Sequence, residues 1–431
     1  MPADPSAPPA SNQDDPGGRT ARQLVVVALV AAAVPLLYLA GTPHHFYDLK
    51  IYMSAMRWWA EGNPLYDYVQ ADSLQGELYF TYPPFTALLL RPFAALHVNL
   101  TIVLFTGLTI LALLVTTWWL VSSVADRHGV SRWFAAGLAV PLAFAVESTR
   151  ETIGFGQINM LLVVLVLADL LFAVPRNSRW AGVGIGLATA LKLYPGIFIV
   201  YLLVTRRWRA ALVSCAAAAG ATLLAAAIAP GDSWRFWTHE LWLTDRVGRP
   251  DYTGNQSLFG LLNRFTTPER PNQALWLALA VAVAAYGLWR AARAARAGDE
   301  VAGLTLTGLV AVLVSPITWT HHAYWFVPAV VVLVDAGLRP PDPAAGASGR
   351  RRRVAPLSLA AVVTAVIVYG VVSYYDWGRT FDRTDTPGEF LLRNLYVLFA
   401  LLLLVVLPIR RGSSGVPATS EAAKHEPSIR Q

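Results

Sequence analysis

The chain has 431 residues, of which 55% are hydrophobic and only 14% are charged. Because soluble globular domains carry about 25% charged residues, this composition excludes an ordinary soluble domain and indicates an integral membrane protein. The formal net charge of +7 comes largely from short arginine clusters between apolar runs, a pattern typical of cytoplasmic membrane loops, so nucleic acid is not an expected partner.

Membrane-spanning helices are predicted along most of the chain, after a polar N-terminal segment. Residues 1–23 are rich in Pro, Asp and Gly, which predicts a disordered cytoplasmic tail. The apolar run 24–41 lacks an A-x-A-like cleavage site, so we expect an uncleaved first helix. A span needs about 20 mostly apolar residues. Further apolar runs lie at 100–125, 133–147, 158–174, 181–205, 210–229, 273–293, 301–318, 323–338, 355–374 and 389–408.

The segment 181–205 carries positive flanks on both sides, at 176–179 and 206–209, and positive flanks belong in the cytoplasm. Pro195 in its middle breaks a helix. A single straight span would also place Lys192 near the bilayer centre, at a cost of about 2.5 to 3.5 kcal/mol. We therefore expect two short helices in a hairpin, with Lys192 at the outer apex and both termini of the chain in the cytoplasm.

The predicted fold is an all-α polytopic membrane protein of about 12 transmembrane helices with extracytoplasmic juxtamembrane helices. The stretch 80–96 is apolar but interrupted by prolines, which predicts an interfacial or re-entrant helix on the outer face. The expected organisation comprises a catalytic transmembrane module 24–338 with outer loops 42–99 and 230–272, an arginine-rich cytoplasmic linker 339–354, a C-terminal helical pair 355–409 and a disordered tail 410–431. The outer loop 230–272 contains five arginines, which are unexpected outside the cytoplasm. Either one of the predicted helix boundaries is wrong, or this loop meets anions.

An unusual carboxylate follows the first apolar run, in the stretch HHFYDLKIY (44–52). If residues 48–59 form a helix, Asp48 and Tyr52 share one face and Lys50 points elsewhere. Asp48 can simply cap that helix, as Asp often does. Alternatively, an ionised carboxylate can take a proton from a sugar hydroxyl. The two roles are compatible.

Two further acidic residues lie in ESTRETIGFGQIN, where Glu147 and Glu151 are four residues apart. This spacing puts both on one helical face, which is unfavourable without a cation. Arg150 or Lys192 can supply that cation. A solvated loop rim is the simpler interpretation for Glu147.

Polar and aromatic residues in the other outer clusters are the substrate-binding candidates. Adjacent histidines point in different directions on a helix, so the pair near residue 321 is not expected to chelate a metal, and neither a metal nor a cofactor is predicted. Either histidine can be an interfacial hydrogen-bonding group or can donate to a phosphate or sugar oxygen. The candidates are Tyr52, Tyr82, Arg150, Gln157, Asn159, Lys192, Asn255, Gln256, Trp319, His321 and His322.

Six stretches occur in a fixed order over residues 44–328: FYDLKIY, FTYPPF, GFGQINMLL, GLATALKLYPG, NQS and SPITWTHH. Together they resemble the actinobacterial polyprenol-phosphate-mannose-dependent alpha-1,2-mannosyltransferases of glycosyltransferase family 87, which have the multispanning C fold (GT-C). The resemblance implies an inverting transfer of mannose from polyprenyl-phosphate-mannose to the 2-hydroxyl of a mannosylated lipid or lipoglycan. It also implies that Asp48 is the base, at an active site on the extracytoplasmic side of the plasma membrane.

Elementary electrostatics agrees with this expectation, because a leaving polyprenyl phosphate needs cations where its charge develops. Lys192, His322 and Arg150 are the local candidates. Two alternatives remain: a C-fold transferase that uses another polyprenyl-phosphate sugar, arabinose or glucose, and a lipid-linked sugar transporter, since polar groups in membrane proteins also mark translocation paths. The one-sided polar clusters favour an enzyme.

Overall fold

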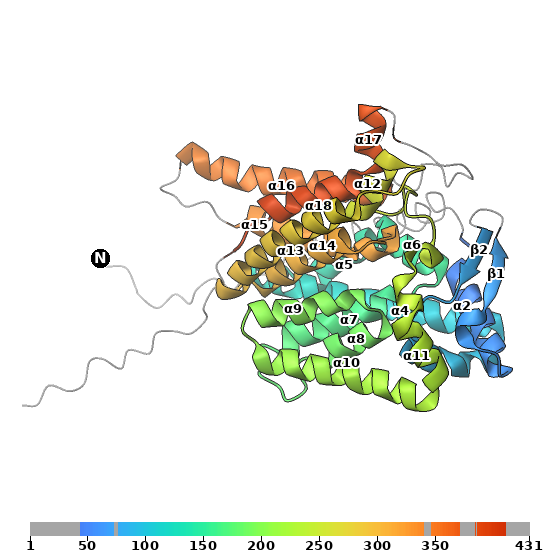
Figure 1. Ribbon diagram of the computed structural model, residues 1–431. Helices are drawn as coiled ribbons and strands as arrows, with labels where there is room; N and C mark the ends of the chain where they lie inside the picture. Colours follow the sequence, from blue (N-terminus) through green and yellow to red (C-terminus); the bar gives the residue numbers. More distant parts are fainter. Residues whose placement is uncertain (1–43, 73–75, 340–345, 371–383, 385, 411–431) are drawn as a thin grey trace, which may run out of the picture.

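The computed structural model describes residues 44–72, 76–339, 346–370, 384 and 386–410. The apolar run 24–41 lies outside the described residues. Most of the described chain is helical, and the helices of its main bundle lie roughly along one direction (Figure 1). These helices are α4 (Val98–Arg127), α5 (Arg132–Ala145), α7 (Asn159–Ala168), α8 (Val183–Leu191), α9 (Ile197–Val204), α10 (Trp208–Ile228), α13 (Gln273–Arg296), α14 (Glu300–Val314), α15 (Phe326–Leu338), α16 (Gly346–Tyr369) and α18 (Leu395–Val406).

Several of these helices suit a membrane. Within the described residues, four helical segments are long and apolar enough to span one: α4, α10, α13 and the segment Thr320–Leu338, which joins the 3-10 helix η7 (Thr320–Trp325) to α15. A fifth is added if the bent pair of α17 (Pro387–Arg393) and α18 forms one span. The prediction of a multi-pass helical membrane protein is confirmed at this level, and the count of about 12 spans stays a prediction.

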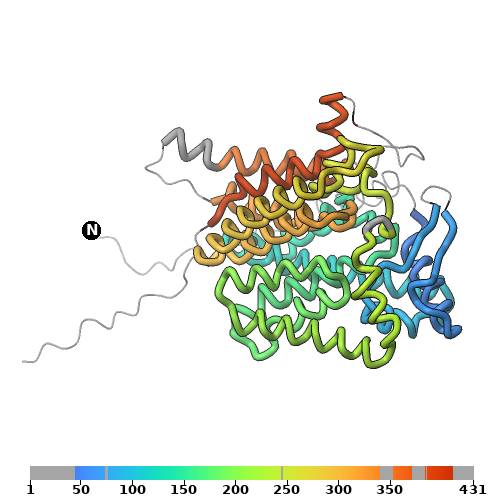
Figure 2. The backbone as a smooth tube through the Cα atoms, viewed as in Figure 1, coloured from blue at the N-terminus to red at the C-terminus, as the bar shows by residue number. Residues whose placement is uncertain are grey.

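The segment 181–205 is broken as expected. Helices α8 and α9 are separated by Lys192, which is extended, and by a short 3-10 turn at Tyr194–Gly196. At the start of α8, Gly182 has φ +105, and a Cβ there would lie 2.1 Å from the Ala210 carbonyl oxygen at the start of α10. The start of α8 thus lies against the start of α10, and α9 ends four residues before α10 begins. Both ends of the segment therefore lie at the same end of the bundle, as a hairpin requires (Figure 2).

Shorter elements gather at the other end of the bundle, at the right of Figure 1. They are α2 (Tyr47–Ala60), β1 (Val69–Asp72), β2 (Gly76–Tyr79), α3 (Pro84–Leu90), α6 (Glu147–Phe155), α11 (Pro230–Thr238) and α12 (Leu258–Thr266). The strands pair antiparallel, with Val69 opposite Tyr79 and Asp72 opposite Gly76. This hairpin corrects the all-α prediction. Its strands are four residues long and largely exposed, so the sequence carries little of the apolar alternation that marks a strand.

The C-terminal region also differs from expectation. Helix α16 begins at Gly346, inside the expected arginine-rich linker. Arg410, expected as the first residue of a disordered tail, is buried and ion-paired. Its Nε donates to Asp299 at 2.8 Å and its Nη1 donates to Asp335 at 2.7 Å. The chain after α18 is therefore tied to the ends of two other helices.

Asp335 is the centre of this ionic cluster and is fully buried. Besides Arg410, it accepts hydrogen bonds from Arg127 at 3.0 and 3.2 Å and contacts His128 Nε2 at 2.8 Å. Removing one member of a buried ion pair leaves the other charges uncompensated, which typically costs about 3 to 5 kcal/mol. The cluster joins the ends of α4 and α15 to the segment after α18.

We expect Asp335→Asn to lower the thermal unfolding temperature of the detergent-solubilised protein strongly, because its four cationic or cationisable partners lose this counter-charge. Asp126→Asn is the matched control, since Asp126 pairs with Arg132 at the same end of the bundle while both side chains are about half exposed. Exposed pairs contribute at most about 1 kcal/mol. Equal shifts for the two variants, measured in the same detergent, would contradict a stabilising role for the cluster.

Candidate functional site

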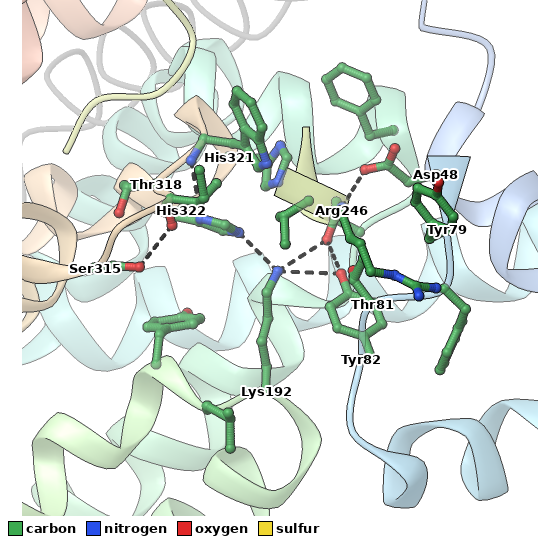
Figure 3. Close-up of a pocket in the computed structure, with 18 of the residues that line it drawn as sticks. Asp48, Tyr79, Thr81, Tyr82, Lys192, Arg246, Ser315, Thr318, His321 and His322 are labelled. Atoms are coloured by element: carbon green, nitrogen blue, oxygen red, sulfur yellow. Dashed lines mark hydrogen bonds between the residues drawn. The ribbon is translucent and has the colours of Figure 1, made fainter. Parts of the chain in front are cut away.

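A cavity of about 740 Å³ lies at the end of the bundle that carries α2 and the β-hairpin. Its walls come from segments far apart in sequence: α2, β2, the break between α8 and α9, the end of α14, the loop into η7, and the chain after α11. Figure 3 shows side chains from these segments turned toward one another. The predicted site residues in its lining are Asp48, Tyr52, Tyr82, Gln157, Lys192, Trp319, His321 and His322.

Gln157 joins the predicted base to the aromatic wall. Its Nε2 donates to Asp48 Oδ2 and, at 2.9 Å, to the Tyr52 hydroxyl. The Tyr52 and Tyr82 hydroxyls are 2.8 Å apart, and Tyr82 donates back to Gln157 Oε1 at 2.7 Å. The prediction that Asp48 and Tyr52 share one helical face is thus confirmed.

The capping interpretation of Asp48 is wrong. Helix α2 begins at Tyr47 with Phe46 as its N-cap, and no side chain caps it. Asp48 lies one position inside the helix, and its carboxylate accepts from Gln157 instead. Gly156 permits this approach, because its φ is +72 and a Cβ there would lie 2.6 Å from the Leu49 Cβ.

Burial raises the pKa of Asp48 to about 6, although the hydrogen bond from Gln157 and the charge of Lys192 both favour the ionised form. The carboxylate is therefore ionised near neutral pH and is a stronger base than an exposed aspartate. A base with a pKa near the working pH suits proton abstraction.

Lys192 lies on the other side of the tyrosine pair, and Figure 3 shows its amine between His322 and Tyr82. The Nζ atom is 3.1 Å from Asn159 Oδ1, 3.3 Å from the Tyr82 hydroxyl and 2.8 Å from His322 Nε2. Burial lowers the pKa of this amine, at the break between α8 and α9, to about 7. A bound anion would favour the protonated form, which is a three-donor cation.

Asn255 and Gln256, predicted to bind substrate, are fully buried and lie behind the cavity wall. Asn255 Oδ1 accepts from the backbone of Thr318 at 2.9 Å, and its Nδ2 donates to the Pro316 carbonyl at 3.2 Å. The backbone N–H of Gln256 donates to the Thr318 carbonyl at 2.7 Å. In this structure both residues hold the loop that carries Trp319 rather than line the cavity.

The region around Arg150 also differs from the prediction. Arg150 is not in the cavity lining, and its Nη2 donates to the Val368 carbonyl at 3.0 Å. The two acidic residues of α6 have separate partners: Glu147 accepts from the Tyr396 hydroxyl, and Glu151 contacts His44 Nε2 at 2.9 Å. Neither acid was predicted to have these partners, because both contacts join distant parts of the chain.

Sequence reasoning missed Arg246 as a wall residue. Its guanidinium lies 4.1 Å from the Tyr79 ring centre, donates to the Tyr66 carbonyl at 2.9 Å, and is ion-paired with Glu240. The available signal was the excess of arginine in the outer loop 230–272. Among the residues that the structure describes, no three His, Cys, Asp or Glu side chains come together as a metal site.

Comparison with known proteins agrees with the site chemistry. The sequence model of glycosyltransferase family 87 matches residues 80–316. A polyprenol-phosphate-mannose-dependent alpha-(1-2)-phosphatidylinositol mannoside mannosyltransferase of Mycobacterium tuberculosis is 36% identical over 80% of this chain and 83% of its own length. The protein of the same description from Mycolicibacterium smegmatis is 33% identical over 86% and 85%.

A third relative, a phosphatidylinositol pentamannoside mannosyltransferase of Mycobacterium tuberculosis, is 33% identical over 73% of this chain and 72% of its own. No solved structure matches. The helices long enough to span a membrane and the family match together define a membrane glycosyltransferase. The chain belongs to glycosyltransferase family 87, which confirms the resemblance carried by the six motifs.

Proposed function

We propose that this glycosyltransferase moves mannose from polyprenyl-phosphate-mannose to the 2-hydroxyl of a mannosylated lipid or lipoglycan acceptor, with inversion, at the outer face of the plasma membrane. The observation that carries this proposal is the common cavity of Asp48 and Lys192, in which a base and a cation are separated by Gln157 and Tyr82. The relatives named above use the same donor class and form the same alpha-(1-2) linkage by their descriptions.

The geometry supports a single displacement. Asp48 removes the proton from the acceptor hydroxyl while the oxygen attacks the anomeric carbon from the face opposite the phosphate. The carbon–oxygen bond to the phosphate breaks, and the phosphate leaves with the bonding electrons. Lys192, whose Nζ lies 2.8 Å from His322 Nε2, donates hydrogen bonds where the charge of the phosphate develops. The products are the alpha-linked mannoside, polyprenyl phosphate and protonated Asp48.

The outer-face assignment rests on the arginine distribution. Arg207 pairs with Glu300, and Arg410 and Arg127 meet at Asp335, so the ends of α4, α9, α13, α15 and α18 gather together. This arginine-rich end is opposite the end that carries the cavity (Figure 2). Positive residues favour the cytoplasmic side. The cavity then faces the extracytoplasmic leaflet, where a lipid-linked donor and a lipid-anchored acceptor can both reach it.

The direct test is transfer by the purified protein in liposomes that contain labelled polyprenyl-phosphate-mannose and a phosphatidylinositol mannoside or lipomannan. Methylation analysis of the product should find new 2-linked mannose. Polyprenyl-phosphate-arabinose and polyprenyl-phosphate-glucose are assayed in parallel. Faster transfer from either of these would overturn the donor assignment, and accumulation of sugar lipid across the bilayer without transfer would favour a transporter.

We expect the rate of transfer to fall as the pH falls through about 6. The base acts only when ionised, so with a pKa of about 6 roughly one tenth of the carboxylate remains active at pH 5. The measurement is kcat/KM for the acceptor between pH 5 and 8, with the protein shown to stay folded at pH 5. A rate that is flat over this range would contradict a base with this pKa.

A further inference from the structure

His44 lies beside the predicted base but has no role in the mechanism above. Its ring lines the same cavity as Asp48. Its Nε2 lies 2.9 Å from Glu151 Oε1, and the ring stacks on Phe155 with centroids 3.8 Å apart and planes 13° apart. The side chains of His44 and Glu151 are 17% and 7% exposed, so the pair is largely shielded from solvent. Stacking on Phe155 therefore holds one face of the ring, and the contact with Glu151 holds one of its two nitrogens.

The backbone around His44 is held in an unusual conformation. His45 has φ +51 and Phe46 has φ +56, two successive non-glycine residues in the left-handed region. The Phe46 N–H donates to the Gly154 carbonyl at 2.8 Å, which pins the entry of α2 to the end of α6. Such residues cost about 1 to 3 kcal/mol each and persist where surrounding contacts impose them, often at functional sites.

Gly154 permits the ring to approach α6. A Cβ at this position would lie 3.3 Å from the His44 Cδ2 atom, so a larger residue would crowd the imidazole. Both glycines of the GFG stretch at 154–156 therefore allow a close approach by the segment that begins α2. Gly156 lets Leu49 of α2 approach, and Gly154 makes room for His44.

The contact with Glu151 uses one ring nitrogen of His44. An ionised carboxylate is acceptor-only, so His44 Nε2 carries the hydrogen that Glu151 accepts. The other ring nitrogen, Nδ1, has no hydrogen-bond partner among the described residues. A sugar hydroxyl can both donate and accept a hydrogen bond. The fixed imidazole in the cavity wall therefore suits a sugar hydroxyl.

We propose that His44, oriented by Glu151, forms a hydrogen bond with the acceptor-sugar hydroxyl next to the reacting one. This contact sets which hydroxyl faces Asp48, so His44 is a specificity-determining residue and Glu151 is its positioning residue. The inference rests on the proposed function. It predicts that the enzyme recognises a vicinal diol, in which one hydroxyl is deprotonated and its neighbour is held.

The test compares the mannosyl acceptor with its 3-deoxy analogue in each variant. The wild-type enzyme should use the deoxy acceptor about tenfold less efficiently, as expected for loss of one hydrogen bond to a buried partner. In His44→Ala this discrimination should disappear. Because kcat/KM is compared between two acceptors in the same preparation, a lower amount of folded variant does not change the ratio.

Two further variants separate positioning from packing. Glu151→Gln keeps an acceptor for His44 Nε2 and should keep the discrimination, whereas Glu151→Leu should remove it. His45→Asn is the matched control, because His45 is exposed, lies outside the cavity lining, and has a φ that asparagine tolerates. It should discriminate like the wild-type enzyme.

The inference is overturned if His44→Ala still discriminates about tenfold. If His44→Ala does not fold, persistent discrimination in Glu151→Leu overturns it equally. Failure of the proposed function looks different, because the wild-type enzyme would then transfer no mannose to either acceptor.

Discussion

Asp48→Asn is expected to lower kcat for mannose transfer by about 10²- to 10⁴-fold, the usual contribution of a general base. Asparagine is nearly isosteric and can still accept the hydrogen bond from Gln157, so the surrounding network is preserved while the base is lost. The measurement is the initial rate with saturating donor and acceptor in liposomes.

Asp67→Asn is the control for loss of a carboxylate at the same end of the molecule. Asp67 is about half exposed, pairs with Arg235, and is outside the cavity lining. Its transfer rate should stay near that of the wild-type enzyme. If Asp48→Asn retained wild-type kcat while its gel-filtration profile was unchanged, Asp48 would not be the base.

Lys192→Met is expected to lower kcat by about 10²- to 10³-fold, comparable with removal of one preorganised donor from a developing oxyanion. Methionine has a similar length and no charge, so the main loss is the donor that meets the leaving phosphate. The effect should fall on kcat more than on KM for the acceptor, because the phosphate gains charge as the bond to mannose breaks.

Lys50→Met provides the matched control. Lys50 is exposed on α2, two positions from Asp48, and does not line the cavity. The same substitution there should leave kcat unchanged. A near-normal rate for Lys192→Met would indicate that His322 or another donor holds the phosphate alone.

The parts of the site that follow from local spacing were predictable. The four-residue step from Asp48 to Tyr52 places both on one face, and Gln157 bridges them in the structure. Pro195 predicts the break that presents Lys192 to the cavity. Both inferences need only helical geometry and the backbone restrictions of proline.

Contacts between distant segments were not predictable from one sequence. The partner of Glu151 is His44, about a hundred residues earlier, and the partner of Arg410 is Asp299. Asn255 resembles a substrate-binding amide in sequence, yet its hydrogen bonds are with backbone groups of the loop before η7. Only the fold decides whether a buried amide meets a ligand or a neighbouring chain segment.

The short arms of the α8–α9 hairpin limit how far the enzyme can reach out for its acceptor. With nine residues, α8 rises on the order of 14 Å, less than half of a bilayer core about 30 Å thick. On the proposed topology, α8 rises from the cytoplasmic end, so the ammonium at its tip lies well below the outer surface, and the lipid phosphate must move inward to meet it. The acceptor sugar must also enter the cavity, so its reacting end leaves the outer surface before transfer.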